Sequence, residues 1–389
     1  MRRRGLCADS SGCLPHGSLH CGKRDACEVP RRFINLFDKD GCNMIKEHSK
    51  SVTIKDVAKA ANVSITTVSR VLNNSLGLVN EQTRQRILDV IHELDYSPNA
   101  MARGLHAAQT KTIGLIIQDF TNPYYMGIVR SVEEIAQRLG YTIILTNAQR
   151  SHQKTADYLQ ILREKRVDGI IAIGGRILRD AKVSSLLDKE DMKIVAIGRP
   201  INSNIPSVHI DNALAARNAC EYLISLGHRR IALIVGTAGP TTTERSSGYY
   251  DALKLNGIEV NHNWTVNGNF TFEGGYSAVE NLAPIGGPSG ITAIVAINDV
   301  MAIGAIKYLQ KSGHDVPGDV SVIGFDDIQA ASYVTPTLST VAVPVQGLGR
   351  AAMETLSQMI YDKEAPLSTM FPTKIIARES TAPCKFPAL

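Results

Sequence analysis

The stretch from residue 52 to residue 73 reads VTIKDVAKAANVSITTVSRVLN, and it predicts two short helices joined by a tight turn. Thr53 is a good helix N-cap, and Asp56 three residues later completes a weak capping box. Asn62 suits the turn, because asparagine tolerates the left-handed backbone that such turns often need. Ser64 is placed to cap the second helix. This is the pattern of a helix-turn-helix.

The second predicted helix has one apolar face and one polar face. Its inner positions are Val68, Val71 and Leu72, and its outer positions are Ile65, Thr66, Ser69 and Arg70. The outer face is short and polar enough to enter a major groove, where Arg70 can bond a guanine edge or a phosphate. A third helix opens at Asn80. A small helical bundle with no DNA role fits this generic pattern equally well.

From residue 112 onward, apolar runs of strand length alternate with helical segments. The expected strands are Ile113–Ile117, Thr142–Thr146, Gly169–Ile173, Ile194–Ile197, Ile231–Val235, Ile294–Ala296 and Val320–Ile323. The expected helices include Tyr125–Leu139, Thr155–Lys165, Ala213–Leu226 and Val300–Ser312. Apolar strands separated by helices indicate parallel sheets covered on both faces. The predicted fold class is an N-terminal all-α helix-turn-helix domain plus an α/β core of two doubly wound parallel-sheet lobes.

Residues 1–50 show neither helical nor strand periodicity, so we expect them to be disordered. Met44 stands just before the first patterned segment, and the natural chain could begin there. The segment holds ten basic and six acidic residues, so positive charge is concentrated at the N-terminal end of the chain. A phosphate backbone would attract this charge, although a solvated surface is an equally good reading.

Five of the seven cysteines fall in the first 42 residues. A zinc site could draw on Cys7, Cys13, His16, His20 and Cys21. No Cys-x₂-Cys pair is present, however, so the sequence predicts no metal. The basic start Met1-Arg2-Arg3-Arg4 is not followed by an apolar signal stretch, and no apolar run has the length of a bilayer. Both observations favour a cytoplasmic protein without a membrane span.

The core lacks the short motifs of nucleotide-dependent and hydrolytic enzymes. It has no Gly-x-Gly-x-x-Gly after a strand, no phosphate-binding P-loop, no Gly-x-Ser-x-Gly elbow and no His-Glu-x-x-His. We interpret the pair Asp326-Asp327 as a ligand anchor with a cap rather than as an acid/base pair. His152, His209, His228 and His314 are expected on the surface or at caps. The sequence therefore predicts no catalytic residue and no cofactor.

The runs 52–73 and 96–105, the second reading YSPNAMARGL, resemble the N-terminal signature of the LacI/GalR family of bacterial repressors. The likeness continues to residue 380. It implies a set of DNA-binding residues: Thr53, Ser64, Ile65, Thr66, Thr67, Ser69, Arg70, Asn73, Asn99, Ala102 and Leu105. Residues 99–105 match the hinge helix of the family, in which Leu105 would wedge into the minor groove and kink the duplex.

The remaining likeness is to the effector domain of this family and to the periplasmic sugar-binding proteins. It implies effector contacts at Asn122, Tyr124, Tyr125, Arg199, Asp211, Arg245, Phe270, Asn298, Asp299 and Asp326, with Asp211 the weakest candidate. Ligands of open α/β sheets bind at the carboxyl ends of strands, and Asn122 follows the first strand. The sequence departs from the family at Ala342, where many members carry glutamine. This departure leaves the identity of the sugar open.

We expect four segments along the chain. They are an extension at 1–50, the helix-turn-helix domain at 51–97, a hinge and linker at 98–111, and an effector-binding and dimerisation domain at 112–389. Lobe one is expected to span about 112–209 plus 340–368, and lobe two about 210–339 plus 369–389. The three crossovers between the lobes are expected near 209–211, 339–342 and 366–370.

These features predict a homodimeric, cytoplasmic and nucleoid-associated transcription regulator. Its expected partners are double-stranded operator DNA and a small effector, a monosaccharide or derivative, with no membrane. The most favoured role is repression of a carbohydrate-utilisation operon. The alternatives are a regulator that responds to a purine or another metabolite, a secreted solute-binding receptor, and a sugar-transforming enzyme with a DNA-binding module. The C-terminal residues 381–389 lack an apolar heptad, so no tetramer is expected through a coiled coil.

Overall fold

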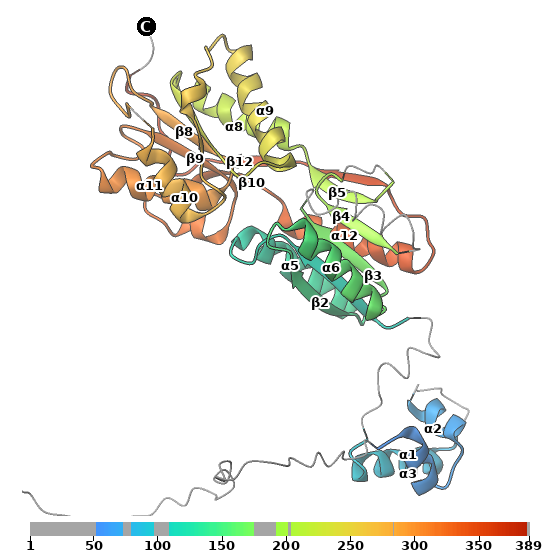
Figure 1. Ribbon diagram of the computed structural model, residues 1–389. Coiled ribbons are helices and arrows are strands. Elements are labelled where there is room, and N and C mark those ends of the chain that lie inside the picture. Colours follow the sequence, from blue (N-terminus) through green and yellow to red (C-terminus); the bar gives the residue numbers. More distant parts are fainter. Residues whose placement is uncertain are drawn as a thin grey trace, which may run out of the picture. The chain divides into compact units, whose positions relative to one another are not determined.

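The computed structural model describes residues 52–72, 79–96, 109–174, 192–200, 204–282 and 284–386. The chain divides into two compact units at Tyr96. The smaller unit is a cluster of helices, and the larger unit is an α/β structure with two sheets (Figure 1). Within the described residues, no helix is both long enough and apolar enough to cross a membrane.

The smaller unit contains α1 (Ile54–Ala60), α2 (Ile65–Leu72) and α3 (Glu81–Glu93). The predicted caps are confirmed. The Asp56 carboxylate accepts hydrogen bonds from the backbone N–H and the hydroxyl of Thr53. The Ser64 hydroxyl accepts the N–H of Thr67 at 3.1 Å, and the Asn80 side chain accepts the N–H of Thr83 at 2.8 Å.

A small apolar core holds these three helices together. Asn62 has a φ of 51°, the left-handed conformation expected for the turn between α1 and α2. The turn brings the apolar faces of the helices together, and the buried residues are Val57, Ala58, Ala61, Val68, Val71 and Ile87. The sequence pattern therefore predicted the inward face of α2 correctly.

The larger unit contains two six-stranded sheets. The first has the order β11-β5-β4-β3-β1-β2, with β1 (Thr112–Ile117), β2 (Thr142–Asn147), β3 (Gly169–Ile173), β4 (Ile194–Ile197), β5 (Ser207–Ile210) and β11 (Ser368–Phe371). The second has the order β12-β10-β9-β8-β6-β7, with β6 (Ile231–Val235), β7 (Thr265–Asn267), β8 (Ala293–Ala296), β9 (Ser321–Asp326), β10 (Ser339–Ala342) and β12 (Lys374–Ile376). Every pair of neighbouring strands is parallel except β10 and β12.

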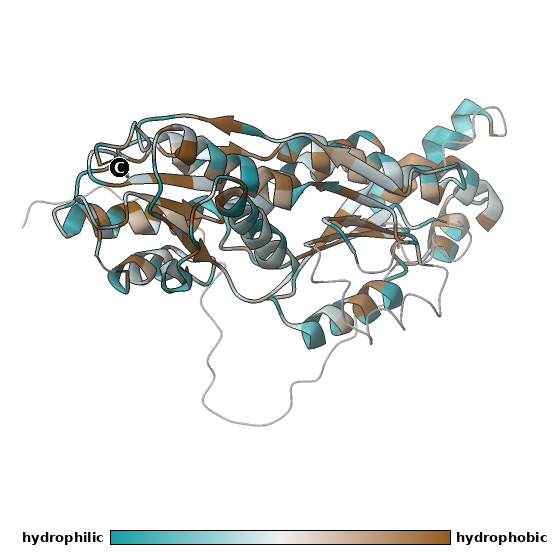
Figure 2. Ribbon diagram, turned by 90° about the horizontal axis from the view of Figure 1, so that it is seen from above, coloured by the Kyte–Doolittle hydropathy of each residue, from teal (hydrophilic) through white to brown (hydrophobic). Residues whose placement is uncertain are grey.

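Helices cover these sheets and define the two lobes. Lobe one is the first sheet with α5 (Pro123–Arg138), α6 (His152–Glu164) and α12 (Val345–Ile360). Lobe two is the second sheet with α8 (Asn212–Ser225), α9 (Pro240–Leu255), α10 (Phe272–Glu280), α11 (Asp299–Lys311) and the short 3₁₀ turns His262–Trp264 and Gln329–Ser332. Many inner strands, such as β3, are buried along their whole length. Figure 2 shows their apolar composition, which is why they were recognisable in the sequence.

The first crossover lies between β5, which ends at Ile210, and α8, which begins at Asn212, close to the predicted 209–211, whereas the other two differ from prediction by a few residues. Strand β10 lies in the sheet of lobe two, so the chain enters lobe one after Ala342 rather than at residue 340. Strand β11 lies in the sheet of lobe one, so the return follows Phe371 rather than falling within 366–370. These two bounds were predicted a few residues off because β10 and β11 are only four residues long, and their pairing partners alone decide their lobe.

Candidate functional site

A pocket in the larger unit lies where the carboxyl ends of strands from both sheets meet. From lobe one it is lined by residues that follow β1 to β5, among them Gln118, Asn122 and Gly198. From lobe two it is lined by residues at or after the ends of β6 to β9, among them Phe270 and Asp326. Parallel sheets place their loops and helix N-termini at this edge, which is the usual ligand position in such folds.

Arg245 and Asp326 form a buried ion pair in the wall of the pocket. Arg245 Nη1 lies 3.3 Å from Asp326 Oδ1. Arg245 Nε donates to Asn212 Oδ1 at 2.9 Å, and Nη1 also donates to the carbonyl of Ile297. The guanidinium carbon lies 3.4 Å from the centroid of the Phe325 ring. These contacts satisfy much of the buried charge and fix the guanidinium in place.

Burial has the largest effect on the pKa values of Asp326, Tyr124 and Tyr125. It raises the pKa of Asp326 to about 7, although Arg245 acts in the opposite direction. Burial likewise raises the pKa of Tyr125 to about 12 and raises that of Tyr124 further. Both phenols are therefore neutral hydrogen-bonding groups near neutral pH. Asp326 has a φ of 117°, a conformation that is rare outside glycine and occurs most often at functional sites.

Three aromatic rings form apolar faces of the pocket. Tyr124 and Tyr125 begin α5 behind the Asn122 cap, and their rings meet edge to face with centroids 5.3 Å apart. The Tyr125 hydroxyl donates to Gln118 Oε1 at 3.2 Å. In lobe two the Phe270 ring packs against Gly236, where a Cβ atom would lie 1.9 Å from the ring. This glycine is required because only a bare backbone leaves room for the ring.

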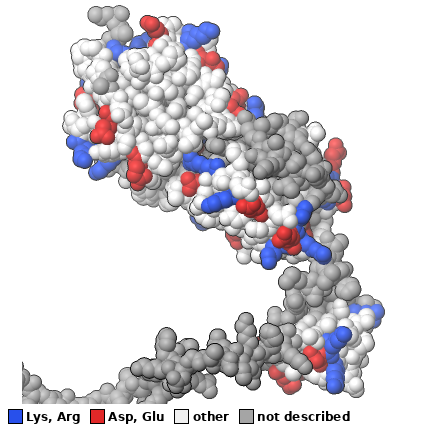
Figure 3. Space-filling model, in the orientation of Figure 1, with Lys and Arg blue, Asp and Glu red and all other residues white. Residues whose placement is uncertain are grey.

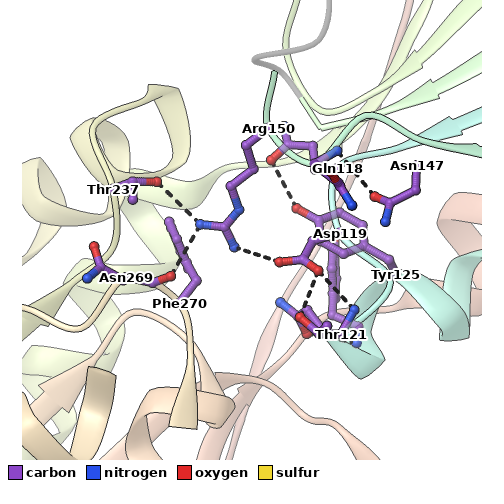
Figure 4. Close-up of polar contacts among 12 residues, drawn as sticks. Gln118, Asp119, Thr121, Tyr125, Asn147, Arg150, Thr237, Asn269 and Phe270 are labelled. Atoms are coloured by element: carbon purple, nitrogen blue, oxygen red, sulfur yellow. Dashed lines mark hydrogen bonds and ion pairs between the residues drawn. The ribbon is translucent and has the colours of Figure 1, made fainter. Parts of the chain in front are cut away.

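Arg150, in the loop after β2, connects the two lobes across the pocket (Figure 4). Its Nη1 lies 3.3 Å from Thr237 Oγ1 and 3.4 Å from the carbonyl oxygen of Asn269, both in lobe two. Its guanidinium carbon lies 4.6 Å from the centroid of the Phe270 ring. On its own side, Nη2 lies 3.6 Å from Asp119 Oδ2. These are long contacts for a guanidinium, so Arg150 is held loosely.

Asn298 caps α11 and leaves one donor unused. Its Oδ1 accepts the N–H of Met301 at 2.9 Å. Its Nδ2 is buried and has no hydrogen-bond partner in the described structure, and the residue lines the pocket. A buried unsatisfied donor is costly, so this atom is suited to an acceptor on a bound molecule.

Seven of the ten residues predicted to contact an effector line the pocket. They are Asn122, Tyr124, Tyr125, Arg245, Phe270, Asn298 and Asp326. The structure places the other three elsewhere. Arg199 is exposed after β4, and the Asp211 carboxylate caps α8 by accepting the N–H of Leu214.

Asp299 is the third predicted residue that lies outside the lining of the pocket. It is fully buried, and its carboxylate accepts hydrogen bonds from the Thr340 hydroxyl and from the N–H of Ile328 at 2.8 Å. Burial raises its pKa to about 6. Its geometry therefore fits the internal support of β10 and the loop after β9 rather than contact with a ligand.

Several lining residues were missed by sequence reasoning. They include Gln118, Arg150, Asn212, Thr237, Thr241 and Thr242. Gln118, Arg150, Asn212 and Thr237 come within three residues of a strand end, and this position was the available signal. His209 also lines the pocket and is buried, so its expected surface or capping position was wrong. Burial and the nearby Arg199 lower its pKa, which favours a neutral imidazole. His228 is likewise buried, between Thr292 and the carbonyl of Ala382.

The outer face of α2 in the smaller unit is available to a partner. Ile65, Thr66 and Arg70 are exposed, whereas Thr67 and Ser69 are half-buried. Thr53 and Ser64 are exposed at the caps of the helix-turn-helix. Basic and acidic side chains both lie on the visible face of this unit (Figure 3). Asn73, Asn99, Ala102, Leu105 and the cysteines of the extension lie outside the described residues.

Comparison with known families matches both units of the chain. Residues 53–99 match the model of bacterial regulatory proteins of the lacI family. Residues 110–381 match the model of periplasmic binding proteins and the sugar-binding domain of the LacI family. The chain belongs to the LacI family.

Individual LacI-family proteins are similar over most of their length. The chain is 37% identical over 313 residues to the HTH-type transcriptional repressor PurR of Photobacterium profundum, covering 80% of this chain and 92% of the relative. The lac repressor dimer bound to operator and the anti-inducer ONPF has a TM-score of 0.75 and 26% identity, over 86% of this chain and all of that one. The complex of the transcriptional regulator CelR with cellobiose has a TM-score of 0.64 and 31% identity, over 85% and 99%.

The LacI-family match confirms the predicted fold class and the predicted general function. This protein is a DNA-binding transcription regulator with a separate effector-binding domain. Members of the family bind operator DNA and sugars or other small effectors as dimers. The relatives are regulators rather than enzymes, in agreement with the expectation drawn from the missing enzyme motifs.

Proposed function

We propose that this regulator responds to a monosaccharide or a close derivative bound in the pocket between its lobes. The observation that carries the proposal is the combination of aromatic faces with fixed polar groups. Tyr124, Tyr125 and Phe270 offer flat apolar surfaces that suit the C–H faces of a sugar ring. Arg245, Asp326 and Asn298 supply donors and acceptors that suit ring hydroxyls. The cellobiose bound by CelR supports a carbohydrate ligand.

Ligand binding would control DNA binding through the relative position of the lobes. Because residues from both lobes line the pocket, a bound molecule stabilises one arrangement of the lobes over others. We propose that this arrangement determines whether the hinge residues 98–111 of two subunits can pair on DNA. The coupling free energy equals the difference between the free energies with which the ligand binds the two states. Typical values are about 1–3 kcal/mol.

The DNA side of the proposal places α2 in the major groove of an operator. Ile65, Thr66 and Arg70 would meet base edges or phosphates, and a thymine methyl is a fitting contact for Ile65. A homodimer would read two half-sites of a near-palindrome. We place the protein in the bacterial cytoplasm and its target in a carbohydrate-utilisation operon.

A purine base is the second candidate effector. A flat heterocycle would also stack on Tyr124 or Phe270, and its ring nitrogens could pair with Asn298 and Asp326. The two candidates need differently placed hydrogen-bonding groups in the pocket. A purine forms hydrogen bonds in the plane of its ring, whereas a sugar forms them through hydroxyls around a puckered ring.

The decisive experiment is a thermal-shift screen of neutral monosaccharides, disaccharides, sugar acids, sugar phosphates and purines. Hits are then tested for their effect on binding to an operator selected from random duplexes, and for chemical turnover. A hit that raises the Tm and changes operator affinity supports the proposal. Turnover without an effect on operator binding would instead assign a sugar-transforming enzyme, and a purine as the sole hit would select the second candidate.

A further inference from the structure

The N-terminus of α9 enters the pocket without a side-chain cap. The lining includes every residue from Thr237 to Thr242, and α9 begins at Pro240 with Gly239 as its N-cap. Gly239 supplies no capping side chain, and the first turn has no acidic residue. The N–H groups of Thr241 and Thr242 belong to the first turn, where a helix has no internal acceptors for them. This helix end therefore presents two donors and a partial positive charge to the pocket.

Two buried side-chain donors in the same pocket also have no acceptor. In the described part of the chain, the lining residues with such atoms are Arg150, at Nε, and Asn298, at Nδ2. Asn298 is only 1% exposed, so water does not readily satisfy its amide. The unused groups are thus all donors. A molecule that offers only acceptors would satisfy them, and carboxylates and phosphates have this property.

The charges in the pocket also favour an anion. Arg245 Nη1 lies 3.3 Å from Asp326 Oδ1 and forms a buried ion pair with it. Arg150 Nη2 lies 3.6 Å from Asp119 Oδ2, which is a longer contact. The other oxygen of Asp119 accepts the N–H and the hydroxyl of Thr121 at 2.9 and 2.7 Å. Of the two arginines, Arg150 therefore has the weaker carboxylate contact and is the better placed to pair with a bound anion.

Arg150 and the start of α9 converge on one residue. Arg150 Nη1 lies 3.3 Å from the Thr237 hydroxyl, and the Thr242 hydroxyl donates to the Thr237 carbonyl at 2.8 Å. Figure 4 shows the Arg150 guanidinium between Asp119 and the loop of Thr237. The geometry places a guanidinium fork and a helix N-terminus close enough to share one small anionic group.

We propose that the effector carries an anionic group, a carboxylate or a phosphate ester, that binds between Arg150 and the N-terminus of α9. The proposal rests on the effector role of the pocket proposed above and specifies the class of ligand. Arg150 is then a specificity-determining residue that selects acidic sugars over their neutral parents. The aromatic rings and the Arg245–Asp326 pair hold the rest of the sugar.

The first test uses inorganic phosphate as the probe and does not require the effector to be known. The full-length protein is melted in sodium phosphate and in sodium chloride of equal ionic strength. We expect phosphate to raise the Tm of the wild type more than that of Arg150→Gln, with Arg138→Gln, an exposed change on α5, behaving as the wild type. Phosphate also stabilises proteins in general, but that effect is equal in all three proteins. Equal Tm increases would overturn the proposal.

The second test compares acids with their neutral parents by isothermal titration. The pairs are gluconate and glucose 6-phosphate with glucose, galacturonate with galactose, and ribose 5-phosphate with ribose. We expect at least one acid to bind at least tenfold more tightly than its parent, as a charge-assisted hydrogen bond implies, and expect Arg150→Gln to remove this preference. If uronates or aldonates bind, the anionic group of the effector is a carboxylate. If sugar phosphates bind, it is a phosphate ester.

A third variant tests whether the effect of Arg150→Gln comes from the loss of the anion site or from a change in stability. Gly239→Asp places a carboxylate at the N-cap of α9, where aspartate is a favourable cap and the extended backbone accepts it. We expect an unchanged or higher Tm together with loss of the phosphate-dependent increase. If neutral sugars bind as well as acids and change operator affinity, this inference falls while the proposed function stands. If no sugar, acidic or neutral, binds, the proposed function fails as well.

Discussion

The Arg245 guanidinium and the Asp326 carboxylate lie 3.3 Å apart, and both side chains are buried. Arg245 projects from α9, and Asp326 ends β9, 81 positions later in the chain. Each charge is tolerable in this interior only because the other is present. The pair therefore presents polar atoms that are fixed in place to the pocket.

Arg245→Ala should destabilise the protein and abolish its response to the effector. Without Arg245, the buried acceptors on Asn212, Ile297 and Asp326 lose their donor, which costs about 1–3 kcal/mol. Urea unfolding of the full-length protein measures this loss. Arg217→Ala is the matched control, because Arg217 pairs with Glu221 on the surface of α8 and its loss should cost less than about 1 kcal/mol. A normal effector response in Arg245→Ala would contradict the assignment of the pocket.

Ionisation of Asp326 should lower the stability of the unliganded protein as the pH rises toward 7. The pKa of Asp326 in the folded protein is about 7, well above its ordinary value of 3.8, so the folded state binds more protons than the unfolded state between these values. Burial lowers the pKa values of His209 and His228, and this makes the Tm rise with pH over the same range in the wild type and in the variant alike. From pH 5.5 to pH 7.5 the Tm of Asp326→Asn should therefore fall less, or rise more, than that of the wild type. Asp299, whose pKa is about 6, should contribute a further decrease of the Tm with pH at the acid end of this pH range in both proteins. An identical slope in the wild type and the variant would refute this role of Asp326.

Arg70→Ala should weaken operator binding while effector binding stays the same. The side chain is exposed on the outer face of α2, where it can reach a base edge or a phosphate. Loss of such a contact costs about 1–3 kcal/mol, which corresponds to an increase in Kd of about fivefold to 150-fold. Fluorescence anisotropy with the selected operator at several salt concentrations measures the effect. Unchanged operator affinity would remove Arg70 from the interface.

Gly304→Ala should destabilise lobe two, because α10 and α11 pack with their backbones in close contact. A Cβ atom at Gly304 would lie 2.1 Å from the carbonyl oxygen of Phe272, and a backbone atom cannot rotate away. We expect a loss of about 1–3 kcal/mol from overpacking in chemical unfolding. Gly127→Ala in α5 is the control, since its added methyl would meet only the Val345 side chain at 3.2 Å. Equal losses in the two variants would contradict this account.

Local signals in the sequence were sufficient for much of the secondary structure, although five of the described strands, β5, β7, β10, β11 and β12, were not predicted. Gly169–Ile173, Ile194–Ile197 and Ile231–Val235 were predicted as strands with the bounds that the structure has. These strands are buried on both faces, so an unbroken apolar run marks each of them. The caps at Thr53, Ser64 and Asn80 were predicted for a similar reason, because a cap depends on residues within one turn of helix.

The pocket was only partly predictable from the sequence. Tyr124, Phe270 and Asp326 belong to recognisable motifs at strand ends and were assigned to it. Asp299 stands beside Asn298 in the chain, yet its carboxylate turns into the protein toward Thr340 and Ile328 while Asn298 lines the pocket. Arg150 belongs to no motif, and its significance depends on Thr237 and Phe270, which come from the other lobe.

The sequence by itself determined the helix-turn-helix, the alternation of strands and helices, and the class of protein, because each depends on neighbours within a few positions or on motifs written along the chain. Only the tertiary structure decided which lobe holds β10 and β11, which polar side chains meet in the pocket, and which donors there lack acceptors. These properties depend on contacts between residues far apart in the chain, such as Arg150 and Asn269, and no local pattern records them.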